Sequence, residues 1–216
     1  SATRDADVLL ACARELALQD ERWSIVVAEL LQRRVRLPPA AVQLRHAQEC
    51  LAQLVRLVGN LQVHVRADRS WRILLKALQR DYRRARRRIP GKQTDPEGDA
   101  WHAWRKAVKT HGVQIEVLRE SIQGVAGLRR RRVDRLGDLL GWEHDLQLLA
   151  QTLVAAPVGA PHVFGTDAEV TLLQETLAAL RTQYQSEARA LGRRLFHAPA
   201  RRFARQLRWG EMAAQV

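Results

Sequence analysis

Residues 101–109 read Trp-His-Ala-Trp-Arg-Lys-Ala-Val-Lys, and basic residues recur in this stretch at helical spacing. His102, Arg105, Lys106 and Lys109 stand at i, i+3, i+4 and i+7, so on an α-helix they share one face. Like charges at these spacings destabilise their own helix through repulsion. The histidine adds a charge only near or below neutral pH. The stretch therefore predicts a helix whose basic face meets an anion.

The whole chain is strongly basic and has the composition of a folded helical protein. Its 216 residues carry 36 Lys and Arg against 23 Asp and Glu, which gives a net charge of +13 and a pI near 11.2. This excess favours nucleic acid, acidic membrane or another polyanion as partner. Hydrophobic residues make up 46%, which argues against a disordered basic tail.

Hydropathy and cysteine usage predict a cytoplasmic protein. No apolar run approaches the roughly 18 residues of a membrane span, and no signal-peptide pattern opens the sequence. Cys12 and Cys50 each lie in a periodic apolar segment, so both are interpreted as small core residues in a reducing compartment.

Helical periodicity runs along almost the whole chain, and no segment shows the alternation of a strand. Asp20 has the pattern of an N-cap, and Thr166 with Glu169 forms a capping-box pattern. Gly192 is predicted to follow the end of the long helix that Thr166 opens. Helices are predicted over residues 4–19, 20–31, 38–64, 68–89, 100–123, 127–154 and 166–191, with a basic helix to about 207. The prediction is an all-α fold.

One internal repeat divides the chain. Residues 4–10 resemble residues 144–149, and Asp5 aligns with Asp145. Both carboxylates are interpreted as helix-start residues or as partners of nearby arginines, not as catalysts. A single domain, 1–216, is predicted with a first half 1–89, a linker 90–99 rich in proline and glycine, and a second half 100–216. No basic helix precedes the first repeat, so we expect the first half to lack its opening helices.

A second basic block precedes the linker. Lys76, Arg80, Arg83, Arg84 and Arg87 form a ridge at helical spacing, flanked by Arg86 and Arg88. The guanidinium group of arginine can donate hydrogen bonds to two phosphate oxygens at once. The alternative is a solvated face paired with acids, although only Asp81 is near. A solvated face paired with acids is more strongly favoured for residues 129–132, because acids follow closely in the sequence. For the arginines of 193–208, anion binding and a solvated face are equally favoured.

No other group of residues in the sequence predicts a binding or catalytic site. Trp101, Trp104 and Trp142 are expected to be core residues rather than base-stacking platforms. The sequence has no metal-ligand spacing, nucleophile–base pair or phosphate-binding glycine loop. We therefore predict a protein that is not an enzyme and uses no metal or cofactor.

Four ordered motifs resemble the CHAD domain, the conserved histidine α-helical domain: residues 4–9, 82–88, 101–109 and 139–146. The resemblance spans nearly the whole chain and implies two related helical-bundle halves around a basic central groove or pore. It also implies non-catalytic binding of inorganic polyphosphate. The Glu-x-Glu-x-Lys signature of an accompanying triphosphatase domain is absent, and His111 and Gly112 depart from the family pattern. The predicted polyphosphate-binding residues are Lys76, Arg80, Arg83, Arg84, Arg86, Arg87, His102, Arg105, Lys106 and Lys109.

Other functions stay open from the residues alone. A helical nucleic-acid-binding protein is the first alternative, with nucleic acid as a weaker polyanion, although no helix-turn-helix or RNA-binding signature is present. A structural protein of polyphosphate or storage granules is the next, and an enzyme acting on phosphate esters ranks last. A homo-oligomer, or a partner that completes the first half, would account for the missing helices.

Overall fold

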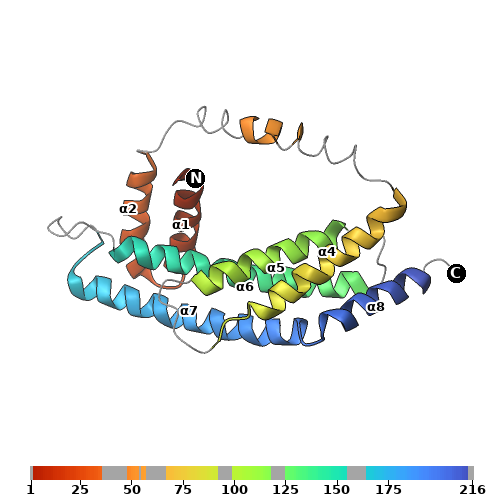
Figure 1. Cartoon of the computed structure of the whole chain (residues 1–216). Helices are drawn as coiled ribbons and strands as arrows, with labels where there is room; N and C mark the ends of the chain where they lie inside the picture. The colour runs from red at the N-terminus through yellow and green to blue at the C-terminus, as the bar shows by residue number, and fades with distance from the viewer. Residues whose placement is uncertain are drawn as a thin grey trace. The chain divides into compact units, whose positions relative to one another are not determined.

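Helices form all the regular structure of the residues that the computed structural model describes (Figure 1). These residues are 2–35, 48–53, 55–56, 67–91, 99–117, 125–154 and 164–213. No strand occurs among them, so the predicted all-α fold is confirmed. Most of the predicted helix over 38–64, most of the linker and the loop before Phe164 lie outside the described residues.

The chain groups into two units that divide within α4 (Ala67–Arg87). The first comprises Ser1–Leu74 and Val163–Gly165, and the second comprises Leu75–His162 and Thr166–Val216. This division follows spatial contacts, whereas the predicted halves 1–89 and 100–216 follow the internal repeat. The predicted halves stay a prediction.

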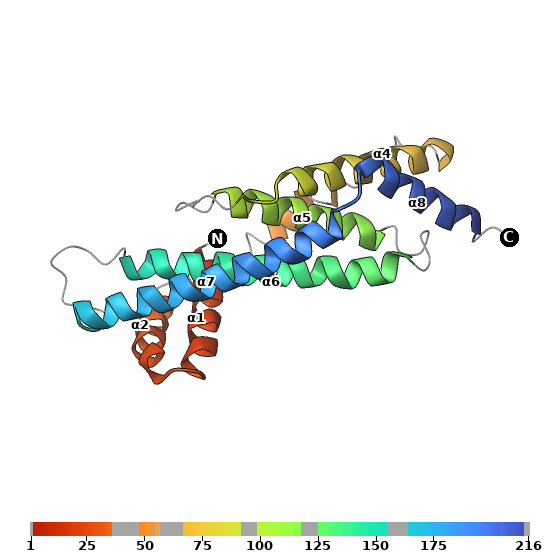
Figure 2. The same cartoon turned by 90° about the horizontal axis from the view of Figure 1, so that it is seen from below.

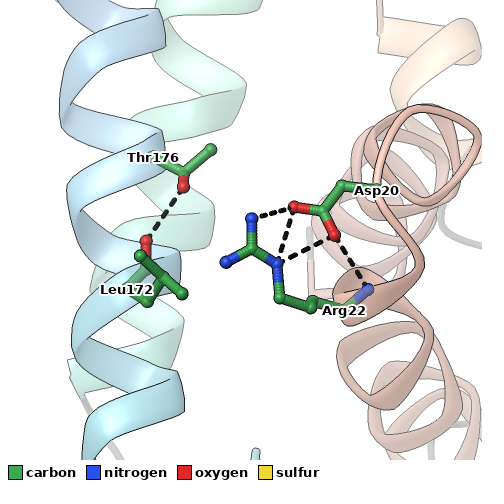
Figure 3. Close-up of polar contacts among 4 residues, drawn as sticks. All are labelled: Asp20, Arg22, Leu172 and Thr176. Carbon is green, nitrogen blue, oxygen red and sulfur yellow. Dashed lines mark hydrogen bonds and ion pairs between the residues drawn. The ribbon is translucent and has the colours of Figure 1, made fainter.

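In the first unit, α1 (Ala2–Ala17) packs against α2 (Ser24–Val35), with the short helix η1 (Glu21–Trp23) between them in the chain. Asp5 lies in the first turn of α1, as predicted. Asp20 caps η1, because its carboxylate accepts a hydrogen bond from the Arg22 backbone N–H at 3.1 Å (Figure 3). The hydrogen bond from the Arg22 side chain lowers the pKa of Asp20. The core of this unit comprises Leu10, Cys12, Ala13, Leu16, Trp23, Val26 and Leu30.

The second unit is built around α6 (Val125–Val154), which packs along both α5 (Asp99–Val117) and α7 (Asp167–Leu195) (Figures 1 and 2). A short turn after α7 leads into α8 (Ala200–Ala213). Trp101 and Trp104 are buried, as predicted. Trp142 is only half-buried and stacks on Tyr184, with ring centroids 6.0 Å apart, so its prediction as a core residue holds in part.

Three sequence predictions, which concern Gly192, Asp145 and Cys50, are wrong. Helix α7 does not end before Gly192 but continues to Leu195. Asp145 lies inside α6 and not at a helix start, because the periodic segment before it is part of the same helix. Cys12 is buried, but Cys50 is exposed, since every described side chain of residues 48–53 is exposed.

The predicted capping box at the start of α7 is confirmed. The Thr166 hydroxyl accepts from the Glu169 backbone N–H at 3.4 Å, and the Glu169 carboxylate accepts from the Thr166 backbone N–H at 2.7 Å. These bonds satisfy backbone donors that a helix start leaves unpaired. The bond from the Thr166 backbone N–H is the largest cause that lowers the pKa of Glu169, and the Thr166 hydroxyl, which donates to the same carboxylate at 2.9 Å, lowers it further.

We expect Thr166→Ala to lower the free energy of unfolding by about 1 kcal/mol, because the cap is lost. Thr176→Ala is the matched control. The Thr176 hydroxyl donates to the Leu172 carbonyl at 2.9 Å within the same helix (Figure 3). Such a bond adds little to a helix interior, where alanine is the better helix former. Urea unfolding of both variants measures the difference, and equal losses would contradict a specific capping role.

Candidate functional site

Helix α4 buries one face and exposes a basic one. From Leu75 onward its buried residues include Leu75, Leu78, Tyr82 and Ala85, at helical spacing. The predicted cations of this helix are all exposed. We call them the arginine ridge: Lys76, Arg80, Arg83, Arg84, Arg86 and Arg87.

The arginine ridge has almost no acidic counterpart. Asp81 is the only acid between Leu75 and Gly91, and it is 2% exposed. It accepts a hydrogen bond from the Gln114 amide of α5 and one from Arg80 Nε at 3.4 Å. Among the described residues, no other ion pair involves the ridge. Its charges are therefore available to a mobile anion.

An aromatic cluster on the opposite face holds α4 in place. The Tyr82 hydroxyl donates to the Ala198 carbonyl at 2.8 Å, and the Tyr82 ring stacks on Phe203 of α8 with centroids 4.3 Å apart. The Arg129 guanidinium carbon lies 4.3 Å from the Phe203 ring centroid and 5.0 Å from that of Tyr82. We call Tyr82, His111, Arg129, Phe196 and Phe203 the aromatic cluster. Burial raises the pKa of Tyr82 and lowers that of Arg129.

His111 is a fully buried member of this cluster. Its ring lies edge-on to Tyr82 at 5.7 Å, and neither ring nitrogen has a hydrogen-bond partner in the described part of the chain. Burial, with the nearby charge of Arg129 as a smaller cause, lowers the pKa of His111 to about 3. The imidazole is therefore neutral near pH 7, and His111 has a core role.

Part of the basic face of α5 is exposed to solvent, and part of it lies against α6. Lys106 and Lys109 are exposed, whereas His102 and Arg105 are half-buried. Arg105 and Lys109 line a groove of ≈ 640 Å³ together with Gly137, Gly141 and the carboxylates Asp134, Asp138 and Asp145 of α6. The groove therefore carries both signs of charge. Burial raises the pKa of Asp145, while Arg105 and Lys109 act in the opposite direction.

His102 meets a histidine that the sequence did not connect with it. The rings of His102 and His144 of α6 are 5.1 Å apart. Burial lowers the pKa of His102, and the charges of Lys106 and Arg105 lower it further. His102 is therefore a neutral donor or acceptor near pH 7. The signal available in the sequence was the neighbouring pair His144-Asp145, since both residues approach α5.

The predicted site residues thus fall into two groups. Arg88, the residue after α4, donates to the Ala103 carbonyl of α5 at 3.2 Å. Among the described residues, no hydrogen bond, ion pair or ring contact joins the ridge to His102, Arg105 or Lys109.

No group of three or more His, Cys, Asp or Glu residues with a metal-holding arrangement occurs in the described ranges.

The other basic tracts have mixed roles. Arg129 is half-buried against the rings of the aromatic cluster, and Arg130 pairs with Glu116 and, at 3.2 Å, with Asp134. Arg181 pairs with the buried Glu143 at 2.9 Å. The acids after residues 129–132 therefore do neutralise part of that tract. On α8, Arg201, Arg202 and Arg205 are exposed.

The fold and this surface define a basic, all-α protein that presents an arginine-rich helix to solvent. A family model described as the CHAD domain matches residues 1–154, which is most of the chain. The chain therefore belongs to the CHAD domain family. Comparisons with curated proteins and with solved structures found no match. Of the described helices, none is long and apolar enough to cross a membrane.

Proposed function

We propose that this protein binds inorganic polyphosphate and does not catalyse a reaction on it. One observation carries the proposal: the exposed arginine ridge has no ion pair among the described residues except that of Arg80 with Asp81. Polyphosphate carries about one negative charge per phosphate and no base. Closely spaced guanidinium groups bind such a chain through bidentate, charge-assisted hydrogen bonds. Membership of the CHAD family supports the same ligand.

The surroundings of the ridge favour polyphosphate over single-stranded nucleic acid. Proteins that bind single strands combine basic grooves with exposed aromatic rings on which bases stack. The aromatic residues packed behind the ridge are Tyr82, Phe196 and Phe203, and each is at most 2% exposed. From Leu75 onward, the exposed side chains of α4 are therefore all cationic and offer no stacking platform. The proposed location is the cytoplasm, on polyphosphate or storage granules.

Competition binding tests the ligand. Labelled long-chain polyphosphate is displaced by single- and double-stranded DNA at equal phosphate concentration, over a salt series. We expect polyphosphate to bind more tightly than either DNA and the affinity to fall steeply with salt as counterions are released. A clear preference for DNA would establish the nucleic-acid alternative instead. Incubation with polyphosphate should release no phosphate, and steady release would contradict the non-catalytic role.

Variants of the ridge test the site. Arg83→Gln/Arg84→Gln/Arg86→Gln/Arg87→Gln should weaken polyphosphate binding at least tenfold, because four bidentate contacts are removed. The matched control is Arg131→Gln/Arg132→Gln/Arg193→Gln/Arg194→Gln, which removes the same charge from exposed positions on α6 and α7. Similar losses in both variants would mean that net charge, rather than the ridge, holds the anion.

A further inference from the structure

Helix α8 is packed directly onto the helix that carries the arginine ridge. Phe203 of α8 stacks on Tyr82 of α4 with an interplanar angle of 13°, and the Tyr82 hydroxyl is bonded to Ala198 just before α8. Arg129 covers both rings. Figure 2 shows α4 and α8 next to one another. Helices that pack through their side chains have axes about 8–10 Å apart.

Helix α8 exposes arginines in the same way as α4. Ala200 and Phe203 are buried, while Arg201, Arg202 and Arg205 are exposed. Residues 200–206 contain no acid. The described contacts give these arginines no carboxylate partner. Thus two adjacent helices both present unneutralised guanidinium groups.

Such an arrangement costs free energy in the absence of an anion. Like charges that come within about one Debye length, ~8 Å at physiological ionic strength, repel one another through solvent. The groove between α5 and α6 differs, because Asp134, Asp138 and Asp145 offset Arg105 and Lys109 there. A polyanion lying along α4 and α8 would remove the repulsion and release the counterions of both helices.

We infer that Arg201, Arg202 and Arg205 of α8 belong to the same anion-binding surface as the arginine ridge, so that one polyphosphate chain contacts both helices. This inference rests on the proposed function. The family model ends at residue 154 and therefore does not cover α8. The aromatic cluster is the structural link, because Tyr82 and Phe203 fix the two helices together with their basic residues exposed.

The test measures the dissociation constant of polyphosphate, and its dependence on salt, for the full chain and three variants. Arg201→Gln/Arg202→Gln/Arg205→Gln should bind about tenfold more weakly. The slope of log K against log salt should fall in magnitude by about 2, as expected for three lost contacts to a single-stranded polyanion. Arg201→Lys/Arg202→Lys/Arg205→Lys keeps the charge and should keep the slope. The control Arg131→Gln/Arg132→Gln/Arg135→Gln removes the same charge from α6 and should change binding less than threefold.

The outcomes separate this inference from the proposed function. If the α8 glutamine variant matches the α6 control while the ridge variant loses binding, α8 is not part of the surface and polyphosphate binding stands. If the unaltered protein binds no polyphosphate, both proposals are overturned. Circular dichroism shows whether each variant is folded. The lysine variant provides a second check, since a loss of salt slope in it would contradict a role based on charge.

Discussion

Replacing His111 with phenylalanine is expected to remove the loss of stability that the neutral buried imidazole causes as pH falls below about 6.5. Burial holds the pKa of His111 near 3 in the folded protein, against 6.5 as its ordinary value. Between these values the unfolded chain binds a proton that the folded protein does not. The contribution of the neutral His111 to the free energy of unfolding is therefore fully present above about pH 6.5 and is lost progressively toward pH 3. The loss is about 1.4 kcal/mol per pH unit, or ~2 kcal/mol between pH 7 and pH 5.

The substitution His111→Phe should not destabilise the protein at pH 7. Both imidazole nitrogens are buried without a partner among the described residues, and an unsatisfied buried polar group costs about 1–3 kcal/mol. A phenylalanine ring has a similar shape and would pack against Tyr82, Phe196 and Phe203. The charged groups that face His111, Arg129 and Asp81, are unchanged by the substitution.

Urea unfolding from pH 4 to pH 8 measures the effect. The slope of unfolding free energy against pH should be much smaller in His111→Phe than in the unaltered protein. His197→Gln is the control, because His197 is exposed and lies outside the aromatic cluster. If His111→Phe keeps the full slope, other groups cause the acid sensitivity and the neutral buried imidazole is ruled out as its source.

The parts of the fold that could be predicted are those that depend on local sequence. The Asp20 cap and the Thr166 capping box were correct because a side chain bonds to backbone groups two or three residues away. The exposed face of α4 followed from the spacing of apolar residues around the arginines. Asp145 was misplaced because the apolar stripe that follows it continues a helix that had already begun.

The parts that could not be predicted depend on what another helix supplies. Among Arg129, Arg130, Arg131 and Arg132, periodicity does not show which guanidinium enters the core, because the rings around Arg129 come from α4 and from residues after 195. The three aspartates of α6 that lie opposite Arg105 and Lys109 could not be predicted, because they are distant from both residues in sequence. A contact of this kind is visible only once the helices are packed.

Gly192→Ala should destabilise the protein, although alanine is the better helix former. A Cβ at residue 192 would lie 2.5 Å from Trp104 Cζ2 and 2.7 Å from Cη2. Real Cβ atoms essentially never approach other atoms so closely, and the Trp104 side chain is fully buried and cannot move into solvent. Glycine is thus present inside α7 because the indole of α5 occupies the space of a side chain. This contact explains why a residue that resembles a helix stop lies within a helix.

Two opposing effects set the size of this change. Alanine in place of glycine stabilises a helix interior by about 1 kcal/mol, whereas overpacking a core costs about 1–3 kcal/mol and sometimes more. With two ring carbons closer than 3.0 Å, we expect overpacking to dominate and the unfolding free energy to fall by ~2 kcal/mol. Gly141→Ala in α6 is the matched control, since its Cβ would meet nothing within 4 Å. That variant should gain roughly 0.5–1 kcal/mol through helix propensity alone. Chemical denaturation of both variants gives the comparison, and a gain in Gly192→Ala would show that α5 and α7 are not packed this closely in solution.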